Sequence, residues 1–226
     1  MTVGPEITTG GIVRVERTSL LYKDAFRDDP VIRYMLSNLS PAARHEYLYS
    51  YFVSLLSAAG MNGASFAEAD DFGACLVLMH PGRRVDNVWT LIPAGFLGVL
   101  WKLGVGGCRR MLGEYEPLTD ASKIKGLKGC KGYYYVFFLA TREAARGQGL
   151  SSALMSKAQE TARADGVPLW LEATTEYSWR LYQKLGFETI DVITLGKGRA
   201  DAEGSQQKGG EGVSVWTMVW WPPKAA

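Results

Sequence analysis

A short segment with two glycines, Arg146-Gly147-Gln148-Gly149, separates the apolar run Tyr133–Ala140 from the helical periodicity of Leu150–Asp165. Backbone N–H groups at the start of a helix lack internal partners and carry part of the positive helix dipole. Glycine lets such a backbone approach a ligand closely, and phosphate is the natural ligand. Arg146 and the hydroxyls of Ser151 and Ser152 add to this chemistry. The segment therefore indicates a phosphate-binding turn, and a tight turn that needs only backbone freedom is the alternative.

Two common phosphate-binding loops do not fit this segment. No Lys-Ser or Lys-Thr pair follows the second glycine, which excludes a nucleoside triphosphatase loop. The three glycines of the dinucleotide-binding fingerprint are also absent. A phosphate-bearing ligand of this turn would therefore belong to another class.

A carboxylate, Glu172, ends the second apolar run of this region, Pro168–Glu172. Sites in α/β proteins gather at the carboxyl ends of strands, where a carboxylate can bind a cationic amine or accept its proton. The segment Tyr133–Leu139 contains no acidic residue, which favours Glu172 as the base. The alternative is a buried glutamate paired with a structural Arg or Lys.

Positioning elements can be assigned along the whole chain. The first half favours a strand at Ile12–Glu16, helical spacing over Leu20–Asn38 interrupted by Pro30, and a helix from Ser40-Pro41 to near Gly60. A hairpin of Ser65–Ala69 with Ala74–Met79 follows. After it come one or two helices over Val88–Glu116 and a loop over Thr119–Lys131. The second half favours strands at Tyr133–Ala140, Pro168–Glu172, Phe187–Leu195 and Val213–Trp221, helices at Leu150–Asp165 and Tyr177–Leu185, and a mobile glycine-rich excursion at Gly196–Gly212 that enlarges the last hairpin. The β-α-β-α-β-β order predicts an α/β protein with a mixed sheet.

The segment Thr141–Gly149 resembles motif A of the GNAT superfamily of acetyltransferases. Gly147 and Gly149 match the motif, whereas Ala144 stands where the family has Gln or Arg. After motif A come the strand Leu169–Glu172, the helix containing Tyr182 and the pair Gly186-Phe187, at the spacing along the chain that is usual in the family. The stretch from Leu171 to Tyr182 is similar to that of puromycin N-acetyltransferase-like small-molecule acetyltransferases.

The resemblance implies a GNAT-like fold of class α/β (α+β), with a central mixed twisted sheet of about six to seven strands flanked by helices. It implies one domain over residues 1–226. Residues 12–131 form its N-terminal half, with an extra helical segment near 88–116, and residues 133–221 form an acetyl-CoA-binding half.

The implied activity is an acyltransferase reaction in which the primary amine of a small molecule attacks the thioester of acetyl-CoA directly. Tyr182 corresponds to the family's general acid near the CoA sulfur, and Glu172 binds the amine or accepts its proton; Tyr182 is otherwise a core tyrosine. The cofactor residues that the resemblance implies are Phe138, Leu139, Ala140, Ala144, Ala145, Arg146, Gly147, Gln148, Gly149, Leu150, Ser151, Ser178 and Tyr182. The N–H of Leu139 is expected to stabilise the oxyanion. Ser178 stands where the family often has an asparagine that contacts pantetheine, and a plain surface serine is the alternative.

The acceptor pocket is less specified by the sequence. Tyr34, Trp89, Phe96, Trp101 and the tyrosines 133 to 135 are candidates to line it, and each is otherwise a core residue. Such aromatics favour an apolar or aromatic amine. Acetylation of a peptide or protein amine, or a CoA-binding module without turnover, are the alternative functions.

The composition of the chain limits which partners, metal sites and locations are expected. The net charge of +2 disfavours nucleic acid as a partner, and three cysteines with two histidines disfavour a zinc site. The N-terminus has no apolar signal segment, and Pro93 and Lys102 interrupt the apolar segment Val88–Gly107, so neither secretion nor a membrane span is expected. We therefore expect a cytoplasmic monomer or homodimer without a metal.

Overall fold

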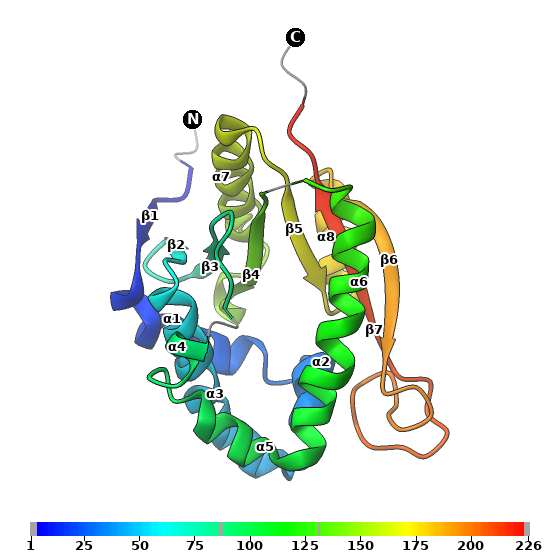
Figure 1. Ribbon diagram of the computed structural model, residues 1–226. Coiled ribbons are helices and arrows are strands. Elements are labelled where there is room, and N and C mark those ends of the chain that lie inside the picture. Colours follow the sequence, from blue (N-terminus) through cyan, green and yellow to red (C-terminus); the bar gives the residue numbers. More distant parts are fainter. Residues whose placement is uncertain (1–3, 86–87, 131, 224–226) are drawn as a thin grey trace.

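In the part of the chain that the structure describes, seven strands form one mixed sheet with the order β1-β2-β3-β4-β5-β7-β6 (Figure 1). The computed structural model describes residues 4–85, 88–130 and 132–223. The strands are β1 Ile7–Gly10, β2 Ser65–Ala69, β3 Ala74–Met79, β4 Tyr134–Thr141, β5 Leu169–Ala173, β6 Glu188–Leu195 and β7 Val213–Trp220. Strands β4 and β5 pair in parallel, and all other neighbours pair antiparallel. The α/β expectation and its strand number are confirmed.

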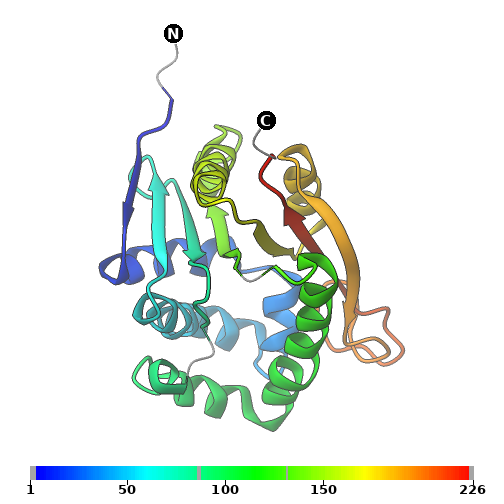
Figure 2. The ribbon, with the colours of Figure 1, turned by 45° about the horizontal axis from the view of Figure 1, so that its top comes forward.

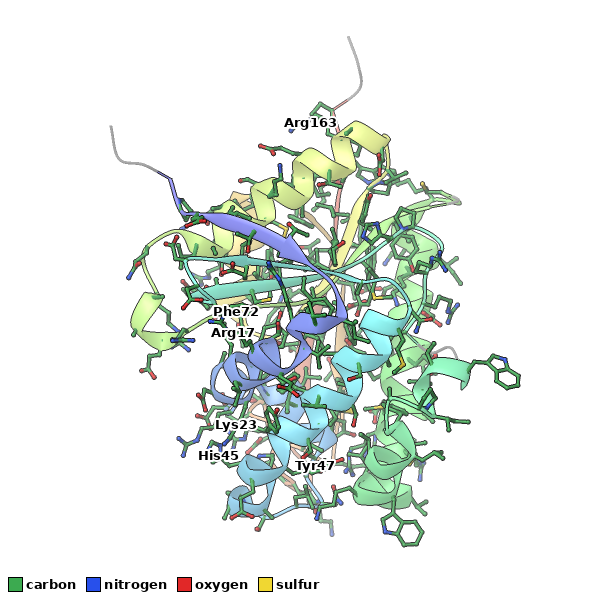
Figure 3. The ribbon with its side chains drawn as sticks, turned by 90° about the vertical axis from the view of Figure 1, so that its left-hand side faces the viewer. Arg17, Lys23, His45, Tyr47, Phe72 and Arg163 are labelled. Carbon is green, nitrogen blue, oxygen red and sulfur yellow. The ribbon has the colours of Figure 1, made fainter. Side chains whose placement is uncertain are left out.

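Helices cover both faces of this sheet. They are α1 Val15–Ala25, α2 Pro30–Met35, α3 Pro41–Met61, α4 Val88–Leu91, α5 Phe96–Arg110, α6 Glu116–Leu127, α7 Leu150–Asp165 and α8 Glu176–Lys184. Short helical turns also occur at η1 Ile12–Arg14, η2 Met111–Tyr115 and η3 Glu143–Ala145. Figure 3 shows α7 on one side of the strands and α1 and α3 on the other. Leu154 of α7 packs in one core cluster, and Phe52 of α3 packs in another.

Local sequence signals explain several of the observed helix ends. The side chain of Asp29 accepts a hydrogen bond from the N–H of Ile32 ahead of Pro30, and Ser40 does the same for Ala43 ahead of Pro41. A capping side chain followed by proline begins a helix, because proline needs no hydrogen-bonded N–H there. The predicted interruption at Pro30, the start at Pro41 and the bounds of α7 are confirmed.

The predicted strand at Ile12–Glu16 is wrong. These residues form η1 and the first turn of α1, and the edge strand lies earlier, at Ile7–Gly10. Ile12 is 44% exposed and Val13 is 88% exposed, so their alternation with polar residues does not mark a buried sheet face. Helix α1 is held near the β2–β3 turn by Arg17, which lies over the ring of Phe72 (Figure 3).

The predicted loop at 119–131 is also wrong, because α6 continues to Leu127. Residue 131 itself lies outside the described residues. Figure 2 shows α5 and α6 running from beneath α3 up to the strands β5 and β7. Gly126 permits this contact, since a Cβ there would lie 2.5 Å from Cζ3 of Trp170 on β5. Helix α6 thus reaches the strand that ends in the predicted functional carboxylate.

The long connection between β6 and β7 has defined partners rather than the expected freedom. The N–H of Gly196 donates to Glu114 at 2.8 Å, and Arg199 pairs with the same carboxylate at 2.9 Å. The side chain of Gln206 donates to the carbonyl of Ser37, and Ala200 forms a β-bridge with Gln206. The enlarged hairpin is confirmed, but it packs against α2 and η2.

Candidate active site

Strands β4 and β5 separate after two residue pairs, Tyr134↔Leu169 and Tyr135↔Trp170 (Figure 1). Beyond these pairs β4 continues to Thr141 and β5 to Ala173 without a described pairing between them. A cleft of about 1460 Å³ opens at this point. Its walls come from β4, the turn before α7, the end of β5, α8, and the α1–α2 and α5–α6 regions. The cleft thus meets the open edge of a strand, a helix start and the carboxyl end of a second strand.

The open edge of β4 presents backbone donors. The N–H of Arg142 donates to the carbonyl of Gly73, directly before β3, over 2.7 Å. Alternate residues of a strand direct their backbone groups to opposite neighbours. The N–H groups of Leu139 and Thr141 therefore face the edge that β5 leaves. The register between β3 and β4 shifts at Val77/Leu78, which leaves Phe137 as an extra residue in a β-bulge.

The helix start has the backbone conformation that its glycines permit. Gly147 and Gly149 both have φ of 79°, and a Cβ on either would meet nothing within 4 Å. Among the described residues, no backbone acceptor is found for the N–H groups of 147–152, whereas Ala145 and Arg146 donate to Arg142 and Glu143. The backbone donors left for an anion are therefore those of residues 147–152. The hydroxyls of Thr141 and Ser151 bond at 2.5 Å and fix α7 to the end of β4.

Tyr182, on α8, lines the cleft and is 7% exposed. Its ring lies 5.7 Å from that of Phe187, and no hydrogen bond to its hydroxyl is found among the described residues. Burial raises the pKa of Tyr182, so the phenol keeps its proton at neutral pH. A protonated hydroxyl that faces a cleft can act as a general acid.

Glu172 also lines the cleft, with a side chain that is only 3% exposed. The indole N–H of Trp170 donates to its Oε1 at 2.7 Å, and Nζ of Lys123 lies 3.9 Å from the same atom. Burial and then the charge of Glu172 raise the pKa values of Tyr115 and Tyr135. The carboxylate therefore stands among two neutral phenols, one indole and one ammonium. Glu172 thus has a lysine partner, as in the structural alternative, and it also lines the cleft.

Two residues of the expected cofactor set have other contacts. Ser178 lines the cleft, but its hydroxyl donates to the carbonyl of Thr175 at 2.9 Å within a capping box. Gln148 does not line the cleft, and its side chain reaches the carbonyl of Ala144 at 3.5 Å. All the other residues of the expected set line the cleft: Phe138, Leu139, Ala140, Ala144, Ala145, Arg146, Gly147, Gly149, Leu150, Ser151 and Tyr182.

The acceptor wall differs from the aromatic set expected from the sequence. Phe96, Tyr133 and Tyr135 line the cleft, but Trp89 and Trp101 are 87% and 90% exposed. Tyr34 is buried elsewhere, where its hydroxyl donates to Glu114, and Tyr134 donates to Asp165. The residues that sequence reasoning missed are Asp29, Tyr51, Tyr115 and Lys123. The extra helical segment therefore supplies part of the cleft wall.

Asp29 links the start of α2 to the residue that follows β5. Its carboxylate accepts hydrogen bonds from the N–H of Ile32 and from the hydroxyl of Thr174, directly after β5. Burial raises the pKa of Asp29, and the bonds from Thr174, Ile32 and Val31 offset part of that effect. The side chain was detectable from the sequence only as a cap ahead of Pro30.

Comparisons with known proteins agree with this geometry. The sequence model described as the Acetyltransferase (GNAT) family matches residues 88–187. An uncharacterised N-acetyltransferase of Schizosaccharomyces pombe is 24% identical over 173 residues, which cover 76% of this chain and 70% of that protein. No helix among the described residues has both the length and the apolar character needed to cross a bilayer.

Two solved structures show the same fold. The polyamine N-acetyltransferase of Drosophila melanogaster aligns with a TM-score of 0.63 and 20% identity, over 96% of this chain and 100% of that one. The arylalkylamine N-acetyltransferase 2 of Aedes aegypti aligns with a TM-score of 0.56 and 16% identity, over 97% of this chain and 99% of that one.

Proposed function

We propose that this chain, an acyltransferase that carries a GNAT acetyltransferase domain, transfers the acetyl group of acetyl-CoA to the primary amine of a small molecule. The observation that carries the proposal is the cleft at the separation of β4 and β5. It connects the free helix start at Gly147–Ser152 with Tyr182 and Glu172. A donor nucleotide and an acceptor amine can therefore meet within one cavity.

The residues of β4 and α7 fit acetyl-CoA. The free N–H groups of residues 147–152 suit a pyrophosphate, with the charge of Arg146 beside them. The open edge of β4 at Leu139 and Thr141 suits the amide groups of pantetheine, which can pair with it as an added strand does. Ala144 offers no side-chain contact, but the backbone donors remain. Bound acetyl-CoA supplies the activated acetyl thioester.

The residues at the far end of this edge suit the chemical step. The N–H of Leu139 stabilises the negative charge that develops on the carbonyl oxygen as the amine adds. The hydroxyl of Tyr182 donates a proton to the departing sulfur. Glu172 attracts the acceptor as its ammonium form and accepts a proton from it directly or through water.

The wall opposite the sheet favours a small amine with an apolar or aromatic body. Phe96, Tyr51 and Tyr115 line this wall, and Tyr135 of β4 lines the same cleft as Glu172, which is the carboxylate that would neutralise one ammonium. The two aligned structures are named for a polyamine and for arylalkylamines. The lining of this chain agrees best with the arylalkylamine type.

The proposal is tested by thiol release from acetyl-CoA in the presence of individual acceptors. The panel contains an arylalkylamine, an aliphatic diamine, an amino acid and a short peptide with a free N-terminus. We expect the largest kcat/KM for the arylalkylamine. Preference for the peptide would replace the small-molecule assignment, and acetyl-CoA binding without release by any amine would indicate a module without turnover.

A further inference from the structure

Tyr22 of α1 lies behind the cleft, on the other side of β4 from its open edge. Its side chain is fully buried, and its hydroxyl lies 3.1 Å from the carbonyl oxygen of Cys75 and 3.1 Å from that of Phe138. The ring is fixed by Phe26 and Phe52, whose centroids lie 5.3 Å and 5.5 Å away. Burial, followed by the neighbouring Cys75, raises the pKa of Tyr22, so the hydroxyl remains a donor.

The carbonyl of Phe138 and the N–H of Leu139 belong to the same peptide unit. The described chain contains no cis peptide bond, so these two groups lie in one plane and point in opposite directions. The carbonyl is held by Tyr22 on the α1 side. The N–H of Leu139 is therefore directed to the open edge of β4, toward the cleft.

This peptide unit has a paired strand on one side only. The bulge at Phe137 interrupts the ladder with β3 directly before it, and β5 has already separated on the other side. Beyond the bulge, Phe138 and Leu139 pair with Val77 and Leu76 of β3, and the Tyr22 hydroxyl adds a further contact to the Phe138 carbonyl. The Tyr22 bond thus restrains a peptide unit whose N–H side has no strand neighbour.

We propose that Tyr22 is a positioning residue for acetyl transfer, because its hydroxyl orients the Phe138–Leu139 peptide so that the Leu139 N–H faces the thioester oxygen. The inference rests on the proposed function. Tyr22 does not line the cleft and does not touch the substrate, so it acts only through this peptide. A displaced oxyanion donor lowers the rate of the chemical step far more than it lowers cofactor affinity.

The kinetic test compares Tyr22→Phe with Tyr134→Phe. Both substitutions keep the aromatic ring and remove one hydroxyl. Tyr134 lies on the part of β4 that pairs with β5, is 3% exposed and does not line the cleft, and its hydroxyl donates to Asp165 of α7. We expect Tyr22→Phe to lower kcat by roughly 10- to 100-fold, with the KM for acetyl-CoA changed by less than about threefold. Tyr134→Phe should keep kcat within about threefold of the wild type. Equal losses in the two variants, or a change in KM alone, would overturn the inference.

A second measurement separates this inference from the proposed function. Nuclear magnetic resonance of 15N-labelled protein follows the Leu139 amide while acetyl-CoA is added. We expect a shift of that resonance in the wild type and its loss in Tyr22→Phe, while the resonances of Gly147 and Gly149 respond in both. If the wild type acetylates no amine, the function proposal fails, and this titration still decides whether Tyr22 orients the Leu139 N–H toward bound acetyl-CoA. The same Leu139 response in both proteins, or none in the wild type, contradicts that role.

Discussion

Nζ of Lys123, on α6, lies 3.9 Å from Oε1 of Glu172, at the end of β5, and both side chains line the cleft. Burial works against the charge of Lys123, but Glu172, with smaller contributions from Tyr133 and Asp120, raises its pKa. The charge of Glu172 therefore favours the ionised form of Lys123. A carboxylate in front of an aromatic wall is suited to attract an ammonium group.

Glu172→Gln should weaken amine binding, because the side chain keeps its shape and loses its charge. A hydrogen bond to a charged group contributes about 1.5–3 kcal/mol, so the KM for the amine should rise roughly 10- to 100-fold. The KM for acetyl-CoA should stay within about threefold. Glu160→Gln, an exposed change on α7, is the matched control. An unaltered KM and kcat for the amine would remove Glu172 from the site.

Tyr182→Phe should lower kcat on the order of 100-fold with little effect on acetyl-CoA affinity. Since burial raises the pKa of the phenol, the wild-type kcat should also show no loss of an acid as the pH increases from 7 to about 9. Initial rates across this range measure both effects, and Tyr134→Phe controls for loss of a buried hydroxyl. A rate equal to the wild type would contradict the role of Tyr182 as the acid.

Gly147→Glu should reduce acetyl-CoA affinity at least about tenfold, because a carboxylate would replace open space beside the free N–H groups and repel phosphate. The matched control is Gly166→Glu at the other end of α7, where φ is also positive and the space is also open. Both variants place a side chain at a positive φ, so calorimetry compares the effect of position. Equal affinities of the two variants would refute the helix start as the phosphate site.

Asp29→Asn should change how stability depends on pH. Burial raises the pKa of Asp29 in the folded protein above its value in the unfolded chain, so the folded state binds the proton more tightly. The stabilisation from this group is complete below the unfolded pKa, near 3.8, and is lost as the pH rises through the folded pKa. Asparagine also caps helices, so the variant should gain stability relative to the wild type over that interval.

Urea unfolding between pH 4 and pH 8 measures this difference. Asp71→Asn, at a carboxylate that is 85% exposed, serves as the comparison and should follow the wild type at each pH. The stability difference between Asp29→Asn and the wild type should vary with pH. A constant difference would show that burial of Asp29 does not make the free energy of unfolding depend on pH.

The helices and strands around the phosphate-binding turn were predictable because each has a local cause. The apolar face of Leu154, Ala158 and Ala162 defines α7, and the left-handed Gly149 and Gly166 mark its ends. The hairpin of β2 and β3 follows from two apolar runs on either side of a polar turn. These signals lie within a few residues of the elements that they define.

Helix α6 escaped prediction because its buried face is polar or small. Its buried residues are Thr119, Ser122, Gly126 and Leu127, of which only the last is large and apolar, so no apolar periodicity appears in the sequence. Its contact with Trp170 depends on residues 44 positions apart, which no local pattern encodes. Lys123 was missed as the partner of Glu172 for the same reason. The assignment of Glu172 to the site came from its place at the end of a strand, and that of Tyr182 came from the family resemblance.

The transfer of an acetyl group from acetyl-CoA to a small amine is tested most directly with an isotopically labelled acetyl group. The purified full chain is incubated with labelled acetyl-CoA and an arylalkylamine, and the amine is examined by mass spectrometry. We predict that the amine gains one labelled acetyl group and that Tyr182→Phe forms it on the order of 100-fold more slowly. An amine that stays unlabelled across the whole acceptor panel, while acetyl-CoA binds, would contradict the account.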